Sequence, residues 1–479
     1  FHRLIFFALE RYGVSKPWLN LINIYYSSLW SKSFSNSSPS SWHQHQKGIF
    51  TGCTLSIILF LSAINVIIEF VCKDQIQSDS SNTPMKAFMD DLFLSSPSVH
   101  QTKEMLKDCV TALSWAQMSF RASKSRSIII EDGKVLKDAP FEISINKNSE
   151  VIPSIQSNPV KFLGRVINAS ISDSEVIKQF TNDITNFLNL IDKSSHRGLH
   201  KVWFLHHLLI PRARWPLLIY EVPLSIVGKL EQKISSLVRK WLKLHPSITN
   251  ISLYSSFSPC PLPLKSLTSI LKSCKVSGHL LLRDSNDPNV SSRSVHLKSG
   301  KWCVEDAVNS AESELEFQKV IGHHQTSKAG FGLIPQRITP EKGSHDYRKL
   351  ISDVIYENDE SVFQARAVQL GLQCNWTKWC NYIKNDLSWN TLLAQPESLS
   401  SFCINSTYNT LPTPSNLVRW GKAKDNSCTL CNQKSATVAH ILSGCKFSLS
   451  QGRYTYRHDS VLRLFLKSIE DFLSSYTPK

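Results

Sequence analysis

The chain has 479 residues, of which 42% are hydrophobic and 19% are charged, enough apolar side chains to bury cores in two to four domains. Its 54 Lys and Arg residues outnumber its 38 Asp and Glu residues, which gives a formal net charge of +16. This composition excludes a disordered or fibrous protein.

Positive charge is concentrated between residues 193 and 301, where 17 Lys and Arg residues accompany only four acidic residues. A local excess of this size favours binding to a polyanion, because each bound phosphate releases condensed counterions. Nucleic acid is therefore the expected partner. An anionic membrane surface is the second choice, and a solvated helical surface without a partner stays open.

The first elements in chain order are expected to be helical. Apolar residues at helical spacing predict helix over residues 1–30, broken at Gly13, and a Ser-rich loop or weak hairpin follows over 31–41. The longest apolar run, residues 57–71, contains polar residues and is shorter than the roughly 20 residues that a bilayer requires. The predicted helix over 55–71 is therefore interpreted as a buried helix and not as a membrane anchor.

The next patterns predict a mixed α+β region. They indicate a β pattern over residues 86–94, a helix over 99–118, a strand over 127–130, a hairpin at Asp132-Gly133 and a strand over 160–167. The pattern then becomes helical over residues 173–244, linkers are expected at 245–263 and 284–300, and residues 301–425 read as mostly helical.

One helix of the basic stretch has an apolar stripe with Lys229, Lys233 and Lys240 off it. These three lysines are candidate nucleic-acid contacts.

Asp90 and Asp91 lie side by side at the expected bend of the 86–94 hairpin. Adjacent carboxylates repel each other unless a cation lies between them, and Mg²⁺ is the usual cation. An exposed turn with two solvated acids is the ordinary explanation when such a pair stands alone.

The segments around this pair do not stand alone, because they resemble the ordered motifs of reverse transcriptases, particularly those of non-LTR retrotransposons. Residues 88–91, Phe-Met-Asp-Asp, resemble the aromatic-x-Asp-Asp motif of the palm, and residues 48–60 are similar to the Gly-x-x-x-Gly-x-x-Leu-Ser-x-x-Leu-Phe motif that approaches template and incoming nucleotide. Downstream, residues 124–125 resemble the Lys-Ser motif near the nucleotide phosphates, and residues 162–164 resemble the Phe-Leu-Gly primer-grip hairpin.

The resemblance implies a right-hand polymerase fold and two-metal nucleotidyl transfer. It implies that Asp90 and Asp91 hold Mg²⁺ and that Lys124 stabilises or protonates the departing phosphate. It also implies contacts to nucleotide, template or primer at Gly48, Thr51, Gly52, Phe162 and Gly164, although Thr51 stands where much of the family has Gln. An exposed lysine at 124 and an ordinary buried strand at 162–164 stay open as alternatives.

One catalytic residue of the family has no counterpart in this sequence. The family carries a further aspartate in an Asp-x-x-x-Ala-aromatic pattern, about ten positions before the segment that His2-Arg3-Leu4-Ile5 matches. That aspartate and the fingers would precede Phe1, so the chain is expected to be truncated at its N-terminus and inactive alone. The loss of one such ligand should cost several kcal/mol of transition-state stabilisation.

Near the C-terminus, Cys428, Cys431, His440 and Cys445 follow the spacing Cys-x₂-Cys-x₈-His-x₄-Cys. Three thiolates and one imidazole form a tetrahedral Zn²⁺ set that leaves no position open for water, so the expected zinc is structural. Buried free cysteines with a satisfied core histidine are the alternative. A similar segment ends many retrotransposon-type polymerases.

Aromatic and Arg residues alternate after this cluster at Arg453, Tyr454 and Arg457. This alternation suits stacking and phosphate contact on single-stranded nucleic acid, although packing of the rings on the zinc knuckle explains it equally well.

The expected fold is α+β, with a reverse-transcriptase palm remnant (1–168), a basic helical thumb-like region (169–300), a helical connector (301–400) and a zinc-knuckle-containing C-terminal domain (401–479). The expected function is that of a partial retrotransposon-type reverse transcriptase, with RNA and DNA as partners and with neither a membrane nor a small-molecule cofactor. The alternative is a non-catalytic nucleic-acid-binding protein derived from a mobile element. Thinly spread cysteines without a secretory signal predict an intracellular protein of the cytoplasm, the nucleus or both.

Overall fold

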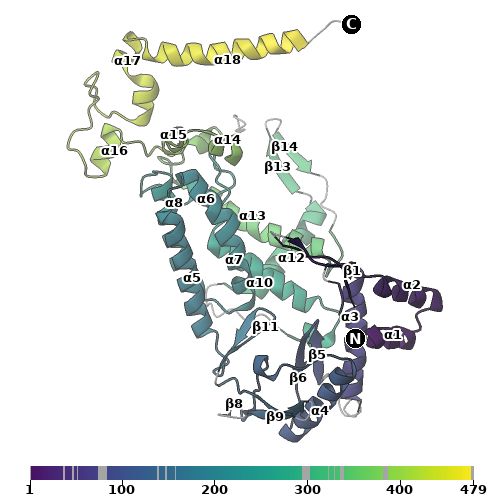
Figure 1. Ribbon diagram of the computed structural model, residues 1–479. Helices are drawn as coiled ribbons and strands as arrows, with labels where there is room; N and C mark the ends of the chain where they lie inside the picture. Colours follow the sequence, from purple (N-terminus) through teal and green to yellow (C-terminus); the bar gives the residue numbers. More distant parts are fainter. Residues whose placement is uncertain are drawn as a thin grey trace. The chain divides into compact units, whose positions relative to one another are not determined.

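The computed structural model divides the chain into two compact units, Phe1–Val176 and Ile177–Lys479 (Figure 1). It describes residues 2–35, 38–45, 48–50, 52–73, 84–136, 140–145, 148–156, 158–293, 302–321, 323–327, 330–334, 339–380 and 387–475. The first boundary expected from the sequence, at 168, lies close to the division between the units. The boundaries at 300 and 400 stay predictions.

The helices of the first unit form where apolar residues recur at helical spacing. They are α1 (His2–Arg11), α2 (Lys16–Ser27), α3 (Thr54–Cys72), α4 (Val99–Trp115) and the 3₁₀ turn η1 (Ala122–Lys124). The predicted break between α1 and α2 is confirmed at Gly13, whose φ of 72° is left-handed. The main core of this unit lies where α3 packs against α1 and α4, and it includes Leu4, Leu59 and Cys109.

Every sheet in the described part of the first unit is a two-stranded antiparallel hairpin. The pairs are β1 (Trp30–Ser31) with β4 (His43–Gln44), β2 (Phe34–Ser35) with β3 (Ser38–Pro39), β5 (Met85–Phe88) with β6 (Asp91–Leu94), β7 (Ile130–Glu131) with β8 (Lys134–Val135), β9 (Phe141–Ile145) with β10 (Asn148–Ile152), and β11 (Val160–Phe162) with β12 (Arg165–Ile167). The hairpin at Asp132-Gly133 is confirmed, because both loop residues have the positive φ of a type I′ turn. The strand expected over 127–130 is instead an isolated bridge at Ser127 and the short strand β7.

Helix α3 is, among the described residues, the one helix long and apolar enough to cross a membrane by length and composition. Core helices of soluble proteins share this property. One side of α3 carries Leu59, Ala63 and Ile67, which are almost fully buried in the core, whereas Ile58 is 61% exposed. In this structure α3 therefore serves as the central core helix of the first unit.

The second unit is helical, with a single hairpin in its described part. Its longer helices are α5 (Ser174–Lys193), α6 (Gly198–Phe204), α7 (Ile210–Ile219), α8 (Leu224–Trp241), α10 (Leu267–Arg283), α12 (Val304–Ile321), α13 (His345–Gln369), α15 (Glu397–Thr407) and α18 (Arg453–Ser475). Its shorter elements are the π-helical turns η2 (Leu205–Leu209) and η4 (His440–Gly444), the 3₁₀ turn η3 (Asn375–Lys378), and α9 (Ile251–Tyr254), α11 (Pro288–Ser291), α14 (Trp389–Ala394), α16 (Pro414–Arg419) and α17 (Lys446–Ser450). Helix α10 packs against α7, α8, α12 and α13, so it occupies the centre of the unit.

Of two sequence-based expectations for this unit, one is confirmed and one is wrong. The described part of residues 301–425 is mostly helical, as expected, with one exception: β13 (His323–Ser327) pairs with β14 (Gly330–Ile334), where two glycines disfavour a helix. The segment 245–263 is not an exposed linker, since it contains α9 and buries Ile248 and Tyr254. Its prolines and serines interrupt regular structure without preventing burial.

Candidate active site and zinc centre

The acidic pair lies at the tip of the hairpin formed by β5 and β6. Phe88 pairs with Asp91 across the two strands, so Met89 and Asp90 form a two-residue loop. Met89 has a φ of 56°, the left-handed conformation that such tight hairpin loops require at their first position. This register places Asp90 in the loop and Asp91 on the first position of β6.

The carboxylates of Asp90 and Asp91 are both exposed. Neither Asp90 nor Asp91 forms an ion pair with any described residue, and no third His, Cys, Asp or Glu joins them in a metal-binding group within the described ranges. Carboxylate oxygens fit Mg²⁺, which commonly binds one or two carboxylates together with substrate phosphates. The hairpin thus provides two ligands of the kind that Mg²⁺ needs.

The two glycines of the upstream motif lie in left-handed backbone, Gly48 with φ 84° and Gly52 with φ 90°. The space above each is open, because an added Cβ would meet no atom within 4 Å. Nε2 of His2 lies 2.7 Å from the carbonyl oxygen of Gly48 and ties the motif to α1. The open space leaves the backbone accessible to a large ligand, and Thr51 lies outside the described residues.

The candidate phosphate contact, Lys124, ends the turn η1 with an exposed side chain. The loop that carries it is held by Arg126, whose Nη1 donates to the carbonyl oxygens of Ser123 and Ser125 and whose Nε donates to that of Asn158. Among the described residues Lys124 makes no ion pair, so its charge is available to an anion.

Residues 162–164 form a hairpin tip and not an ordinary buried strand. Phe162 pairs with Arg165, and the intervening Leu163 and Gly164 have φ angles of 47° and 81°, which define a tight turn. The ring of Phe162 lies 6.1 Å from that of Phe93 on β6, centroid to centroid. This contact links the Phe-Leu-Gly hairpin to the strand that carries Asp91.

The three lysines on α8 differ in their exposure and in whether they form an ion pair. Lys229 is exposed and Lys233 is half-buried. Nζ of Lys240 lies 2.8 Å from a carboxylate oxygen of Asp192, whose other oxygen accepts from Nε1 of Trp241. These two donors lower the pKa of Asp192. The ion pair with Asp192 also holds the side chain of Lys240 against α5.

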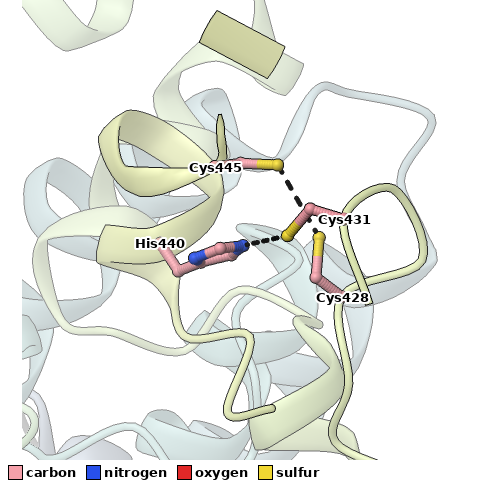
Figure 2. Close-up of side chains that lie close together, drawn as sticks. All are labelled: Cys428, Cys431, His440 and Cys445. Atoms are coloured by element: carbon pink, nitrogen blue, oxygen red, sulfur yellow. Dashed lines mark hydrogen bonds between the residues drawn. The ribbon is translucent and has the colours of Figure 1, made fainter. Parts of the chain in front are cut away.

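The four predicted zinc ligands come together in the second unit (Figure 2). Their ligand atoms all lie within 4.8 Å of one another, with Sγ of Cys431 3.4 Å from Nε2 of His440 and Sγ of Cys428 3.9 Å from Sγ of Cys445. Ligands around a tetrahedral Zn²⁺ with Zn–S bonds of about 2.3 Å are roughly 3.8 Å apart. The spacing therefore fits the ion.

Local backbone lowers the pKa of two of the three thiols, those of Cys428 and Cys445. The turn after Cys428 is closed by hydrogen bonds between Cys428 and the backbone of Asn432 and Gln433. Backbone N–H groups of Cys431 and Leu430 lower the pKa of the Cys428 thiol, and that of Ser448 lowers the pKa of Cys445 to about 6. Thiolates are the form that binds zinc, so both shifts favour the metal.

Tyr454 packs against this cluster at the first turn of α18. Its hydroxyl accepts a hydrogen bond from the backbone N–H of Cys445 at 3.1 Å and lies 3.1 Å from the carbonyl oxygen of Ile441. Arg453 donates to the side chain of Gln451, and Arg457 lies over the ring of Tyr454. The packing alternative for Tyr454 is thus what the structure contains, and nucleic-acid contact by the two arginines stays a prediction.

One reactive group was missed by reasoning from the sequence. The hydroxyl of Tyr25 donates to Sγ of Cys53 at 3.5 Å and lowers the pKa of that thiol to about 7. Cys53 immediately precedes α3 within the upstream motif. A cysteine at the start of a predicted helix was the available signal, because helix N-termini stabilise thiolates.

Two family models match separate parts of the chain. Residues 2–167 match the model described as reverse transcriptase (RNA-dependent DNA polymerase), and residues 372–450 match the model described as zinc-binding in reverse transcriptase. No curated protein matches the chain. The first match covers the carboxylate hairpin and the second covers the Cys₃His cluster.

The matches and the geometry define the class. The chain carries a reverse transcriptase domain followed by a zinc-binding region of the kind found in reverse transcriptases, and these domains imply nucleic-acid binding. The zinc-binding match and the Cys₃His cluster together support a structural Zn²⁺ held by Cys428, Cys431, His440 and Cys445.

Proposed function

We propose that this chain is part of a reverse transcriptase of the non-LTR retrotransposon type, which copies RNA into DNA by two-metal nucleotidyl transfer. The observation that carries the proposal is the Asp90-Asp91 hairpin within the region that matches the reverse transcriptase model. The glycine motif, the Lys124 loop and the Phe-Leu-Gly hairpin occupy the same unit.

Asp90 and Asp91 hold Mg²⁺ in this proposal. When bound, Mg²⁺ supplies the positive charge that lowers the pKa of the primer 3′-hydroxyl and offsets charge on the departing pyrophosphate. Lys124 binds the leaving phosphate, the open backbone at Gly48 and Gly52 admits the template and nucleotide, and the 162–164 hairpin orients the primer.

The proposal includes a third carboxylate from a segment N-terminal to Phe1. Asp90 and Asp91 come from adjacent positions of one hairpin, and two such ligands cannot fix two metal ions without a bridging ligand from elsewhere. Within the described residues no other potential ligand joins them. The chain by itself is therefore inactive in this proposal.

The expected compartment is intracellular. None of the twelve cysteines forms a disulfide, which agrees with a reducing environment.

Primer extension tests the proposal. The chain and a form extended upstream from the native transcript are each incubated with an RNA template, an annealed DNA primer, deoxynucleotides and Mg²⁺. We expect DNA product only from the extended form. Product from the chain alone would contradict the missing-ligand argument, and no product from either form, with RNA binding intact, would reject the polymerase.

A further inference from the structure

The second unit contains an open depression of about 630 Å³, where the end of α13 meets the segment that precedes α9. It is lined by Arg239 of α8, by residues 247–250, by Arg366 and by residues 369–373. Gln373 joins two of these segments, because its Oε1 accepts from the backbone N–H of Thr249 and its Nε2 donates to the carbonyl oxygen of Ser247, both at 2.9 Å. Specific hydrogen bonds therefore hold the walls of the depression.

The lining of the depression carries two positive charges, those of Arg239 and Arg366, and no Asp or Glu. Arg366 is exposed and makes neither an ion pair nor a side-chain hydrogen bond with any described residue. The positions three and four residues away on either side along the chain are apolar or a glutamine, so no carboxylate reaches Arg366 along the helix. Its guanidinium is therefore available to an anion.

The guanidinium of Arg239 bonds only to neutral groups in the described part of the chain. Its Nε lies 3.2 Å and its Nη2 lies 2.9 Å from the carbonyl oxygen of Ile248, and Nη2 also donates to Oδ1 of Asn250. Burial lowers the pKa of Arg239, because the charged form loses hydration. Two cations in one depression without a carboxylate repel each other, and a bound anion would offset both effects.

Neutral N–H donors accompany the two cations. A guanidinium only donates, so Asn250 turns its Oδ1 toward Arg239 and keeps both Nδ2 donors for another partner. Neither these donors nor the side-chain amide of Gln369 form a hydrogen bond with a described residue. At Gly371 the backbone is open, since an added Cβ would meet no atom within 4 Å. Charged and neutral N–H donors without a competing carboxylate are suited to the oxygens of a phosphate group.

We propose that this depression binds a phosphate group, with Arg366 and Arg239 as the charged contacts and Asn250 and Gln369 as neutral donors. The backbone of a nucleic acid and a free nucleotide or polyphosphate are the two sources of such a group. The described lining contains no aromatic residue on which a base could stack, so recognition rests on the phosphate. This site goes beyond the proposed polymerase activity and does not depend on it.

Isothermal titration calorimetry with inorganic tripolyphosphate tests the free source. The full chain is loaded with zinc and freed of nucleic acid. If a free phosphate compound occupies the site, Arg366→Gln should raise the dissociation constant at least about tenfold, because it removes a charge-assisted contact. Lys349→Gln is the matched control, since it removes the same charge from an exposed position of α13 outside the depression. Circular dichroism and zinc content establish that both variants fold.

Fluorescence anisotropy with a single-stranded RNA at several salt concentrations tests the nucleic-acid source. If a backbone phosphate occupies the site, Arg366→Gln should weaken binding and lower the slope of log affinity against log salt by about one. A loss with tripolyphosphate alone would assign the site to a free phosphate compound. A loss with RNA, whether or not tripolyphosphate binding also falls, would assign it to a nucleic-acid backbone.

Two results would overturn the proposal. The first is an Arg366→Gln chain that binds both probes like the wild type, and the second is an equal effect of Arg366→Gln and Lys349→Gln. Neither measurement involves DNA synthesis, so failure of this proposal can be told apart from failure of the polymerase proposal.

Discussion

Met89 is the residue at which the acidic hairpin stores backbone strain. A side chain other than glycine in left-handed backbone costs on the order of 1 kcal/mol, and such residues persist where neighbouring contacts fix them. Here the pairing of Phe88 with Asp91 and the burial of Met85 hold the turn. These contacts fix the turn that carries Asp90 and the start of the strand that carries Asp91.

At the same scale, Cys431 tests the zinc assignment. Loss of one thiolate leaves three ligands, so Cys431→Ser should lower zinc affinity by at least about tenfold, because a serine hydroxyl is a poor ligand for this ion. Metal analysis should find one Zn²⁺ per wild-type chain and less in the variant. Cys303→Ser, which removes an exposed thiol outside the cluster, serves as the control. A Cys431→Ser chain with full zinc content would contradict the assignment.

Helix α3 is the element that decides whether the first unit folds. Ile64 is 3% exposed and belongs to the core, whereas Ile58 on the same helix faces outward. Ile64→Ala should destabilise the unit by about 2 to 5 kcal/mol through lost burial and the cavity left behind, and Ile58→Ala should cost less than about 1 kcal/mol. Hydrogen exchange of the α3 amides measures both. Equal effects would mean that the outer face of α3 is covered in solution.

Helix α8 is the element that tests nucleic-acid binding by the basic region. Within the described residues Lys229 and Lys233 form no ion pair, unlike Lys240, so these two are available to neutralise phosphates. Reversing both to Glu should weaken RNA binding and lower the slope of log affinity against log salt by about two. Fluorescence anisotropy at several salt concentrations measures this slope.

The matched control for this experiment reverses Lys103 and Lys107, which have the same spacing on α4 and are both exposed. If the α4 pair lowers affinity and slope as much as the α8 pair, binding depends on net charge alone and α8 is not the interface.

At the scale of the whole molecule, the sequence predicted best where local patterns act alone. The Cys and His spacing predicted the zinc cluster, and apolar periodicity predicted α3 within a residue at each end. Prediction from the sequence failed where long-range packing determines the local structure. Residues 245–263 look like a linker, yet Tyr254 is buried there and its hydroxyl bonds Ser235, 19 positions away.

The hairpin β9–β10 is a second element that prediction from the sequence missed, here because regular structure was not expected. Residues 141–152 were not assigned as strands from the sequence, yet Phe141 and Ile152 pair across the two strands and enter a core with Leu106 of α4. The alternation of apolar and polar residues over 141–152 is brief. One face of this hairpin is buried because it packs against α4, which lies far from it in the sequence. Contacts of this kind cannot be read from a local pattern.

The measurement that tests the central claim most directly is the rate of single-nucleotide incorporation on an RNA template by the upstream-extended chain. Asp90→Asn removes one carboxylate charge at the hairpin tip and should lower the rate at least about a hundredfold. Asp132→Asn, at the exposed tip of the β7–β8 hairpin, makes the same chemical change in a left-handed position that Asn tolerates, and it should leave the rate unchanged. Full activity in Asp90→Asn would show that this hairpin is not the catalytic centre.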